Sequence, residues 1–146
     1  AELGARALGE AIAELCAGTL VRTKQEHGQA TEAPKLAKAD GQIHWERSAQ
    51  AVHNLVRGMS PWPCAYVGQL EGVLKIHQTR ITHEFLDARG VPGEVIAHDP
   101  HGPVVRCGAG EAVVVTKIQR PGKKAVSGSD FLRGTAMPVG TVLGSP

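Results

Sequence analysis

Residues 103–118, which read Pro-Val-Val-Arg-Cys-Gly-Ala-Gly-Glu-Ala-Val-Val-Val-Thr-Lys-Ile, decide the fold of this 146-residue chain. Two valine-rich runs, Pro103–Cys107 and Ala112–Ile118, flank the turn Gly108-Ala-Gly110. Valine favours strands and glycine favours tight turns, so the stretch predicts two strands joined by a turn. The uninterrupted apolar run Ala112–Val115 predicts that the second strand is buried on both faces.

Further strands are predicted on both sides of this stretch. Ala65–Leu70 and Val73–Arg80 flank Glu71-Gly72, a two-residue loop typical of a β-hairpin, and Glu94–His98 forms another short run. The apolar positions of residues 139–143 are expected to supply a closing strand. Five or six short strands without helices between them predict a mainly β fold, a small OB-like Greek-key barrel.

Two longer segments have the periodicity of amphipathic helices. Leu8, Ile12 and Leu15 share one face of a first helix, which Gly18 is expected to end. Ser48 provides the N-cap of a second helix of about three turns. The second helix directly precedes the strands, and it is predicted to belong to the barrel domain.

The remaining segments predict a short helix and a linker. Ser127-Gly-Ser-Asp130 is a capping sequence for a helix that Gly134 ends. Between residues 21 and 45 the composition becomes polar and glycine-containing, without a sustained period. The predicted organisation is therefore a linker over residues 26–45 and a barrel domain over residues 46–146, with one N-terminal helix of its own.

The composition is that of a soluble globular protein, with 42% apolar and 21% charged residues. The longest apolar run, Ala112–Val115, is far shorter than the roughly 20 residues that cross a bilayer, so no membrane partner is predicted. Cys16, Cys64 and Cys107 are odd in number and widely spaced, which favours a reducing compartment over a disulfide framework.

The sequence contains no recognisable catalytic or metal site. Gly58-Met-Ser-Pro-Trp62 lacks the last glycine of a nucleophile elbow, and Gly108-Ala-Gly110 lacks the Lys-Ser/Thr pair of a phosphate loop. His98, Asp99 and His101 have ligand chemistry but lie in a turn, without a fourth ligand at a recognised spacing. No catalytic residue and no metal ligand is therefore predicted.

Positive charge is concentrated in the C-terminal third. Residues 103–146 carry six Lys/Arg against Glu111 and Asp130, a net charge of +4, whereas residues 1–33 carry −2. This asymmetry indicates an anionic partner. Only five aromatic residues occur in the chain, which argues against a protein that stacks successive bases on a row of rings. The composition alone leaves open whether the basic loop Arg120-Pro-Gly-Lys-Lys124 binds phosphates or is simply solvated.

Several short motifs follow one another in a fixed order over nearly the whole chain. Gly28-Gln-Ala-Thr-Glu-Ala-Pro-Lys35 is followed by Asp40-Gly-Gln-Ile-His-Trp45 and Ser60-Pro-Trp-Pro63. Gln119-Arg-Pro-Gly-Lys-Lys124 and Ser129-Asp-Phe-Leu-Arg-Gly134 come later. Each motif is weak by itself, but their shared order resembles the C-terminal domain of the methionyl-tRNA formyltransferase family, preceded by the end of the catalytic domain.

The resemblance implies that formyl transfer and tRNA binding are carried out by different domains. In that family an N-terminal Rossmann-like domain binds 10-formyltetrahydrofolate and carries the Asn, His and Asp that formylate methionyl-initiator tRNA. No segment here matches that constellation, so residues 1–25 are expected to be the C-terminal helix remnant of that α/β domain, and no cofactor is expected in this part. The implied partners are the initiator tRNA and the missing catalytic domain. The expected setting is a monomer in the bacterial cytoplasm.

The resemblance also implies that the linker and barrel present a basic surface to tRNA. A second interpretation stays open, in which the barrel braces the catalytic domain through the apolar stripe of the first helix and the Pro61-Trp62-Pro63 corner. A third is an autonomous enzyme that uses His98 and His101. The candidate tRNA-binding residues are Lys35, Lys38, Lys75, Arg120, Lys123, Lys124 and Arg133.

Overall fold

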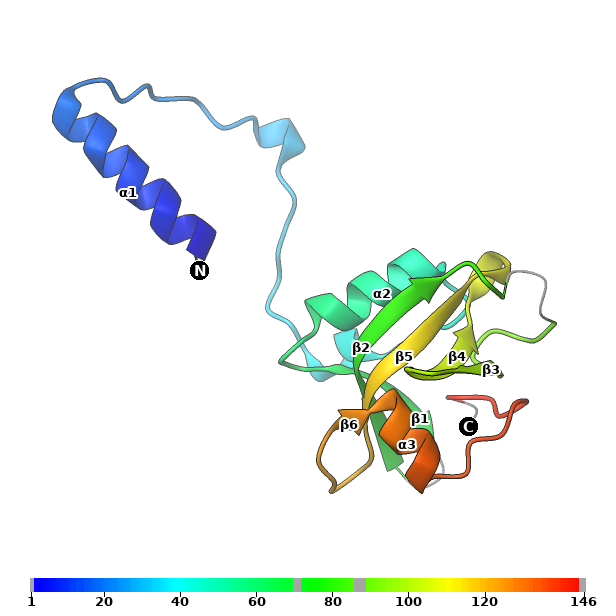
Figure 1. Cartoon of the computed structure of the whole chain (residues 1–146). Helices are drawn as coiled ribbons and strands as arrows, with labels where there is room; N and C mark the ends of the chain where they lie inside the picture. The colour runs from blue at the N-terminus through cyan, green and yellow to red at the C-terminus, as the bar shows by residue number, and fades with distance from the viewer. Residues whose placement is uncertain (1, 70–71, 86–88, 145–146) are drawn as a thin grey trace. The chain divides into compact units, whose positions relative to one another are not determined.

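The computed structural model describes residues 2–69, 72–85 and 89–144. The chain forms two compact units, Ala1–Pro34 and Lys35–Pro146. The first, the N-terminal unit, contains helix α1 (Glu2–Ala17) and the short 3-10 helix η1 (His27–Gln29). The second, the sheet unit, contains the other elements shown in Figure 1. No helix of the described residues is long and apolar enough to cross a membrane.

Helix α1 ends where its sequence predicts. Gly18 follows it with a φ of 71°, the left-handed conformation that glycine adopts at low cost after a helix. None of the residues of α1 is buried. The apolar stripe that includes Leu8, Ile12 and Leu15 therefore has no packing partner within the N-terminal unit.

In the described part of the chain, the sheet unit is built on six antiparallel strands, which confirms the predicted mainly β class. The strands are β1 (Ala65–Gln69), β2 (Gly72–Thr82), β3 (Val95–Asp99), β4 (Gly102–Arg106), β5 (Ala112–Gln119) and β6 (Val126–Ser127). Their order in the sheet is β1-β2-β5-β4-β3, with β6 paired to β5. The loop between β1 and β2 falls outside the described residues.

The sheet is not closed by a further strand within the described residues. The predicted closing strand over residues 139–143 is wrong, because this segment makes only an isolated bridge between Val142 and Glu94. Pro138 has no N–H to donate, and Gly140 has a φ of 96°, so a regular strand is interrupted there. The segment still covers the edge of β3, where Val95 N donates to Thr141 O at 2.8 Å.

The opposite sheet edge, β1, is covered by the segment before the second helix. Ile43 N donates to Tyr66 O at 2.9 Å. Ile43 and Trp45 are 5% exposed and belong to the main core. Two apolar residues of the predicted linker therefore belong to the core of the sheet unit.

The core lies between the sheet and two helices, α2 (Ala49–Gly58) and α3 (Gly128–Gly134). Along β2, Leu74 and Ile76 are buried and Lys75 is exposed, as strand alternation predicts. The first four residues of β5, Ala112–Val115, are all buried, which confirms that this half of the strand is covered on both faces. Figure 1 shows α2 lying along β2, and α3 following directly from β6.

Two glycines set the position of α3. Gly102, at the start of β4, and Gly128, at the start of α3, approach each other over the carbonyl oxygen of Val115 in β5. A Cβ atom on Gly128 would overlap Val115 O and Gly102 Cα. Only glycine allows such close backbone contact, so the sequence fixes α3 against the middle of the sheet.

The three cysteines differ in accessibility, which predicts different reactivity. Cys16 is exposed, whereas Cys64 and Cys107 are buried. Burial raises the pKa of Cys107 to about 12, and the nearby carboxylate of Glu111 acts in the same direction. Since the thiolate is the reactive form, we expect one thiol per folded chain to react rapidly with Ellman's reagent at pH 8, and all three after unfolding. Equal reactivity of Cys107 and Cys16 in the folded chain would contradict this.

Candidate nucleic-acid interface

A row of polar side chains crosses the sheet through neighbouring strands. Lys75 in β2 is paired with Tyr66 in β1 on one side and with Gln119 in β5 on the other. Tyr66 is in turn bridged to Gln42. Cross-strand partners point to the same face of a sheet, and Lys75 and Gln42 are exposed, so this row lies on the outer face.

The loop after β5 is attached to this row through Gln119. The side-chain amide of Gln119 donates from Nε2 to Lys123 O at 2.7 Å, and its Oε1 accepts from His77 Nε2 at 2.8 Å. Lys123 N donates to Arg120 O at 3.1 Å, which closes a turn over residues 120–123. The exposed Arg120, Lys123 and Lys124 are therefore held next to the end of β5 that faces Lys75.

Arg120 and Lys123 also line a hollow of about 400 Å³ between the loop and α3. The guanidinium carbon of Arg120 lies 5.9 Å from the centre of the Phe131 ring, within the range of a cation–π contact. Phe131 is buried in the core, so this contact holds the Arg120 side chain at the wall of the hollow.

Sequence reasoning missed one cation on this surface, Lys117. It is exposed in β5, next to the buried Ile118, and is paired with Ser127 in β6 and Gln78 in β2. The prediction that the whole strand is buried on both faces holds for its first four residues, whereas Lys117 is exposed. We use the name cationic strip for Lys75 and Lys117 on the sheet together with Arg120, Lys123 and Lys124 in the loop after β5. Within the described ranges, no ion pair involves a residue of the strip.

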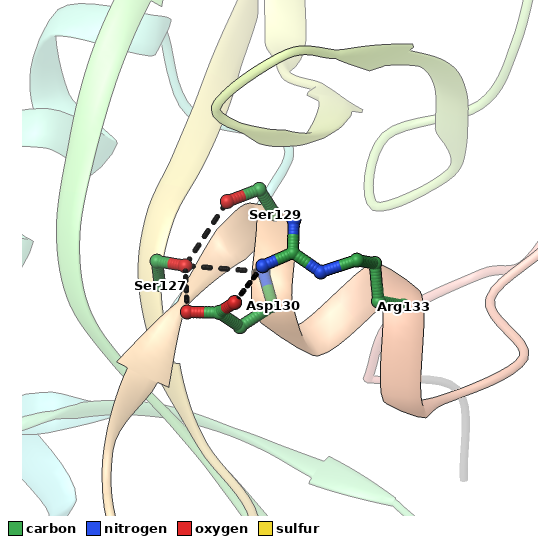
Figure 2. A network of polar contacts seen from close by, with 4 residues as sticks. All are labelled: Ser127, Ser129, Asp130 and Arg133. Carbon is green, nitrogen blue, oxygen red and sulfur yellow. Dashed lines mark hydrogen bonds and ion pairs between the residues drawn. The ribbon is translucent and has the colours of Figure 1, made fainter.

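Arg133, another predicted binding residue, is engaged by a carboxylate. It forms an ion pair with Asp130, three residues earlier in α3. Figure 2 shows Asp130 between Arg133 and Ser127, whose Oγ donates to Asp130 Oδ2 at 2.6 Å. The hydrogen bond from Ser127, followed by the charge of Arg133, lowers the pKa of the Asp130 carboxyl below its usual range. Arg133 therefore offers less net positive charge to a ligand than the strip does.

The same network caps α3, which gives a testable stability prediction. Asp130 N donates to Ser127 Oγ at 3.0 Å, as predicted for an N-cap serine. We expect Ser127→Ala to lower the free energy of unfolding by about 1 kcal/mol in urea titrations. It should also move the Asp130 pKa back toward its usual value, measured by NMR. Ser48→Ala, which removes the cap of α2, should cost a similar amount but leave the Asp130 pKa unchanged. An unchanged Asp130 pKa in Ser127→Ala would contradict the network.

Lys38 lies near the other end of the polar row, in the segment that precedes Gln42. Lys38 begins the 3-10 helix η2 (Lys38–Gly41), whose turn is fixed by a hydrogen bond from Ala37 N to Asp40 Oδ2 at 2.7 Å. Gly41 packs against the backbone of Cys64, just before β1. Lys38 is thus anchored beside β1, while Lys35 is exposed three residues earlier.

The histidine turn considered for metal binding has structural partners instead. His98 Nε2 donates to Met137 O at 2.8 Å, and Asp99 forms an ion pair with Arg80 at 2.9 Å. Asp99 Oδ1 also accepts from His101 N at 2.8 Å. Within residues 2–69, 72–85 and 89–144, no group of three or more His, Cys, Asp or Glu has the arrangement of a metal site.

One of the six basic residues of the C-terminal third contributes nothing to the surface. Arg106 is 5% exposed and donates from Nη1 to the carbonyls of Gly110 and Phe85. Arg106 therefore adds no surface charge for an anionic partner, and the exposed cations of the C-terminal third are the four in the strip from that third, together with the paired Arg133.

Comparisons with known proteins agree with the motif order. The chain is 38% identical over 143 residues to the methionyl-tRNA formyltransferase of Citrifermentans bemidjiense, and this alignment covers 98% of the chain and 43% of that protein. It is 41% identical to the enzyme of the same name from Geotalea uraniireducens, over 97% of the chain and 44% of that protein. The chain thus spans less than half the length of these relatives.

A solved structure shares the fold. A substituted variant of HypX from Aquifex aeolicus superimposes with a TM-score of 0.59 at 19% identity, covering 90% of this chain and 24% of that protein. Another HypX structure, in complex with tetrahydrofolic acid, gives a TM-score of 0.57 at the same identity, covering 86% of this chain and 22% of HypX. The family model described as formyl transferase, C-terminal domain, matches residues 35–136, nearly the whole sheet unit. The predicted resemblance is confirmed, and the chain belongs to the formyl transferase C-terminal domain family.

Proposed function

We propose that this chain is the tRNA-binding part of a methionyl-tRNA formyltransferase. The sheet unit holds the initiator tRNA through its phosphates, and formyl transfer from 10-formyltetrahydrofolate takes place in an α/β domain outside this chain. The observation that carries the proposal is the cationic strip, in which Lys75 and Lys117 are exposed on the sheet and Arg120, Lys123 and Lys124 are held in the loop that directly follows β5. Relatives named methionyl-tRNA formyltransferase supply the identity of the partner.

The chemistry of the strip suits a nucleic-acid backbone. Lysine ammonium groups act as point charges toward phosphates, and each contact releases condensed counterions, which favours binding at low salt. Folded RNA is recognised mainly through its shape and its phosphates, since the deep groove hides the bases. A rigid sheet with fixed charges therefore orients the tRNA, and this orientation lowers the entropic cost of the reaction in the neighbouring domain.

Three histidines of the sheet unit have hydrogen-bond partners that give them structural roles. His53 Nδ1 lies 3.0 Å from Thr79 Oγ1, His77 is bonded to Gln119, and His98 donates to Met137 O. These side chains stabilise packed elements of the fold and do not converge on a shared reaction centre. The proposal assigns the whole chain a binding role, in the bacterial cytoplasm where initiator tRNA is used.

Filter binding with methionyl-initiator tRNA tests the proposed function. We expect the chain to retain tRNA at about 50 mM salt and to lose most of it by about 200 mM, because each phosphate contact contributes a slope of roughly −0.9 in log K against log salt. No retention at low salt would contradict the proposal.

A second candidate function is bracing of the catalytic domain. It is favoured by Trp62, which is 54% exposed between Pro61 and Pro63, and by the unpacked stripe of α1. Charge reversal at Lys123 and Lys124 in the longer enzyme separates the two functions. An unchanged KM for tRNA would favour bracing, whereas a strongly raised KM with an unchanged kcat would favour the tRNA contact.

A further inference from the structure

The hollow beside the cationic strip has two kinds of lining. Its volume of about 400 Å³ lies within the range of small-molecule sites. Arg120 and Lys123 bring positive charge from the loop after β5. Leu74, Phe131 and Met137, all buried, provide an apolar floor. A ligand that fills this space must combine an anionic group with a flat or apolar body.

The cationic wall is held in a fixed arrangement. Arg120 lies over the Phe131 ring, and Lys123 is fixed through hydrogen bonds of its backbone to Arg120 and Gln119. A planar guanidinium held in this way stacks on a nucleobase and also pairs with a phosphate, whereas a lysine in the same place only supplies charge. The hollow therefore offers a surface for a base as well as for an anion.

We propose that the hollow binds a single unstacked nucleotide of the RNA partner. The base lies against the apolar floor of the hollow beside Met137, and its phosphate contacts Arg120 and Lys123. The inference rests on the proposed function, because the cationic strip would hold the neighbouring phosphates. The proposed site contacts one unpaired base. Binding through phosphates alone would not require such a contact.

Adenosine monophosphate, adenosine and inorganic phosphate, each added to the ¹⁵N-labelled full chain, test the proposal by NMR. We expect the monophosphate, at concentrations up to about 10 mM, to shift the amide signals of residues 120–123 and 131–137. Adenosine and phosphate separately should shift them much less, because each makes only part of the contacts. Equal shifts from phosphate alone would overturn the proposal, since the base would then have no part in binding.

Two lysines of one loop provide a matched pair of variants. Lys123 lines the hollow and the adjacent Lys124 does not. Lys123→Gln should weaken binding of the monophosphate about tenfold, and Lys124→Gln should change it less than twofold. Equal effects of the two lysine variants, or no shift of these signals by the monophosphate, would refute the hollow as a nucleotide site.

Filter binding of tRNA to the same variants distinguishes failure of the nucleotide-site proposal from failure of the proposed tRNA-binding function. If tRNA is retained while the monophosphate shifts none of these signals, the hollow proposal fails and the proposed function stands. If tRNA is not retained at low salt either, the proposed function fails as well.

Discussion

Gly128→Ala is expected to lower the free energy of unfolding by about 3 kcal/mol, a large part of the 5–15 kcal/mol that stabilises a typical domain. The new methyl group would overlap Val115 O and Gly102 Cα, which are backbone atoms of β5 and β4. Neither strand can move away without breaking its ladder, so α3 must shift instead. Urea titration followed by circular dichroism measures the change.

A second glycine of the same helix provides the control. Gly134 ends α3, and a Cβ atom there would meet no atom within 4 Å. Gly134→Ala should therefore leave stability unchanged or raise it slightly. The explanation of how α3 is positioned would be wrong if Gly128→Ala unfolded at the same urea concentration as Gly134→Ala.

Charge reversal of Lys123 and Lys124 together is expected to weaken tRNA binding on the order of 100-fold at low salt. The double variant replaces two attractions to phosphates by two repulsions within the cationic strip. Both lysines are exposed and their side chains make no hydrogen bond in the described part of the chain, so the fold should be unaffected. Filter binding gives the affinity, and thermal unfolding checks the fold.

The matched control changes the net charge by the same amount, but at another place on the sheet unit. Arg47 and Arg57, both exposed, lie just before α2 and in its last turn, respectively. Reversing both should weaken tRNA binding severalfold through the long-range field alone, which salt screens. An equal loss of affinity in the two double variants would mean that net charge, and not the strip, accounts for binding.

The strands and helix ends were predictable because their signals are local. Alternation along β2 placed Leu74 and Ile76 inside, and the valine run at 112–115 indicated full burial. Ser48 and Ser127 cap their helices as expected from a hydroxyl followed by free N–H groups. Each of these features depends on residues within a few positions of one another.

The features that the sequence did not predict depend on distant contacts. Ile43 and Trp45 are isolated apolar residues in a polar segment, and only the gap beside β1 makes them core residues. The sequence counts Arg106 among the cations of the C-terminal third. Its side chain is buried and donates hydrogen bonds to the carbonyls of Gly110 and Phe85. The hollow joins parts of the chain as far apart as Gly72 and Thr141, so no local pattern encodes it.

The salt dependence of tRNA binding tests the central claim most directly. It is measured for the unchanged chain and for a variant with glutamine at Lys75, Lys117, Lys123 and Lys124. If these residues contact phosphates, the slope of log K against log salt becomes shallower by roughly 2–4 in the variant. An identical slope in both proteins would show that the tRNA phosphates are bound elsewhere or not at all.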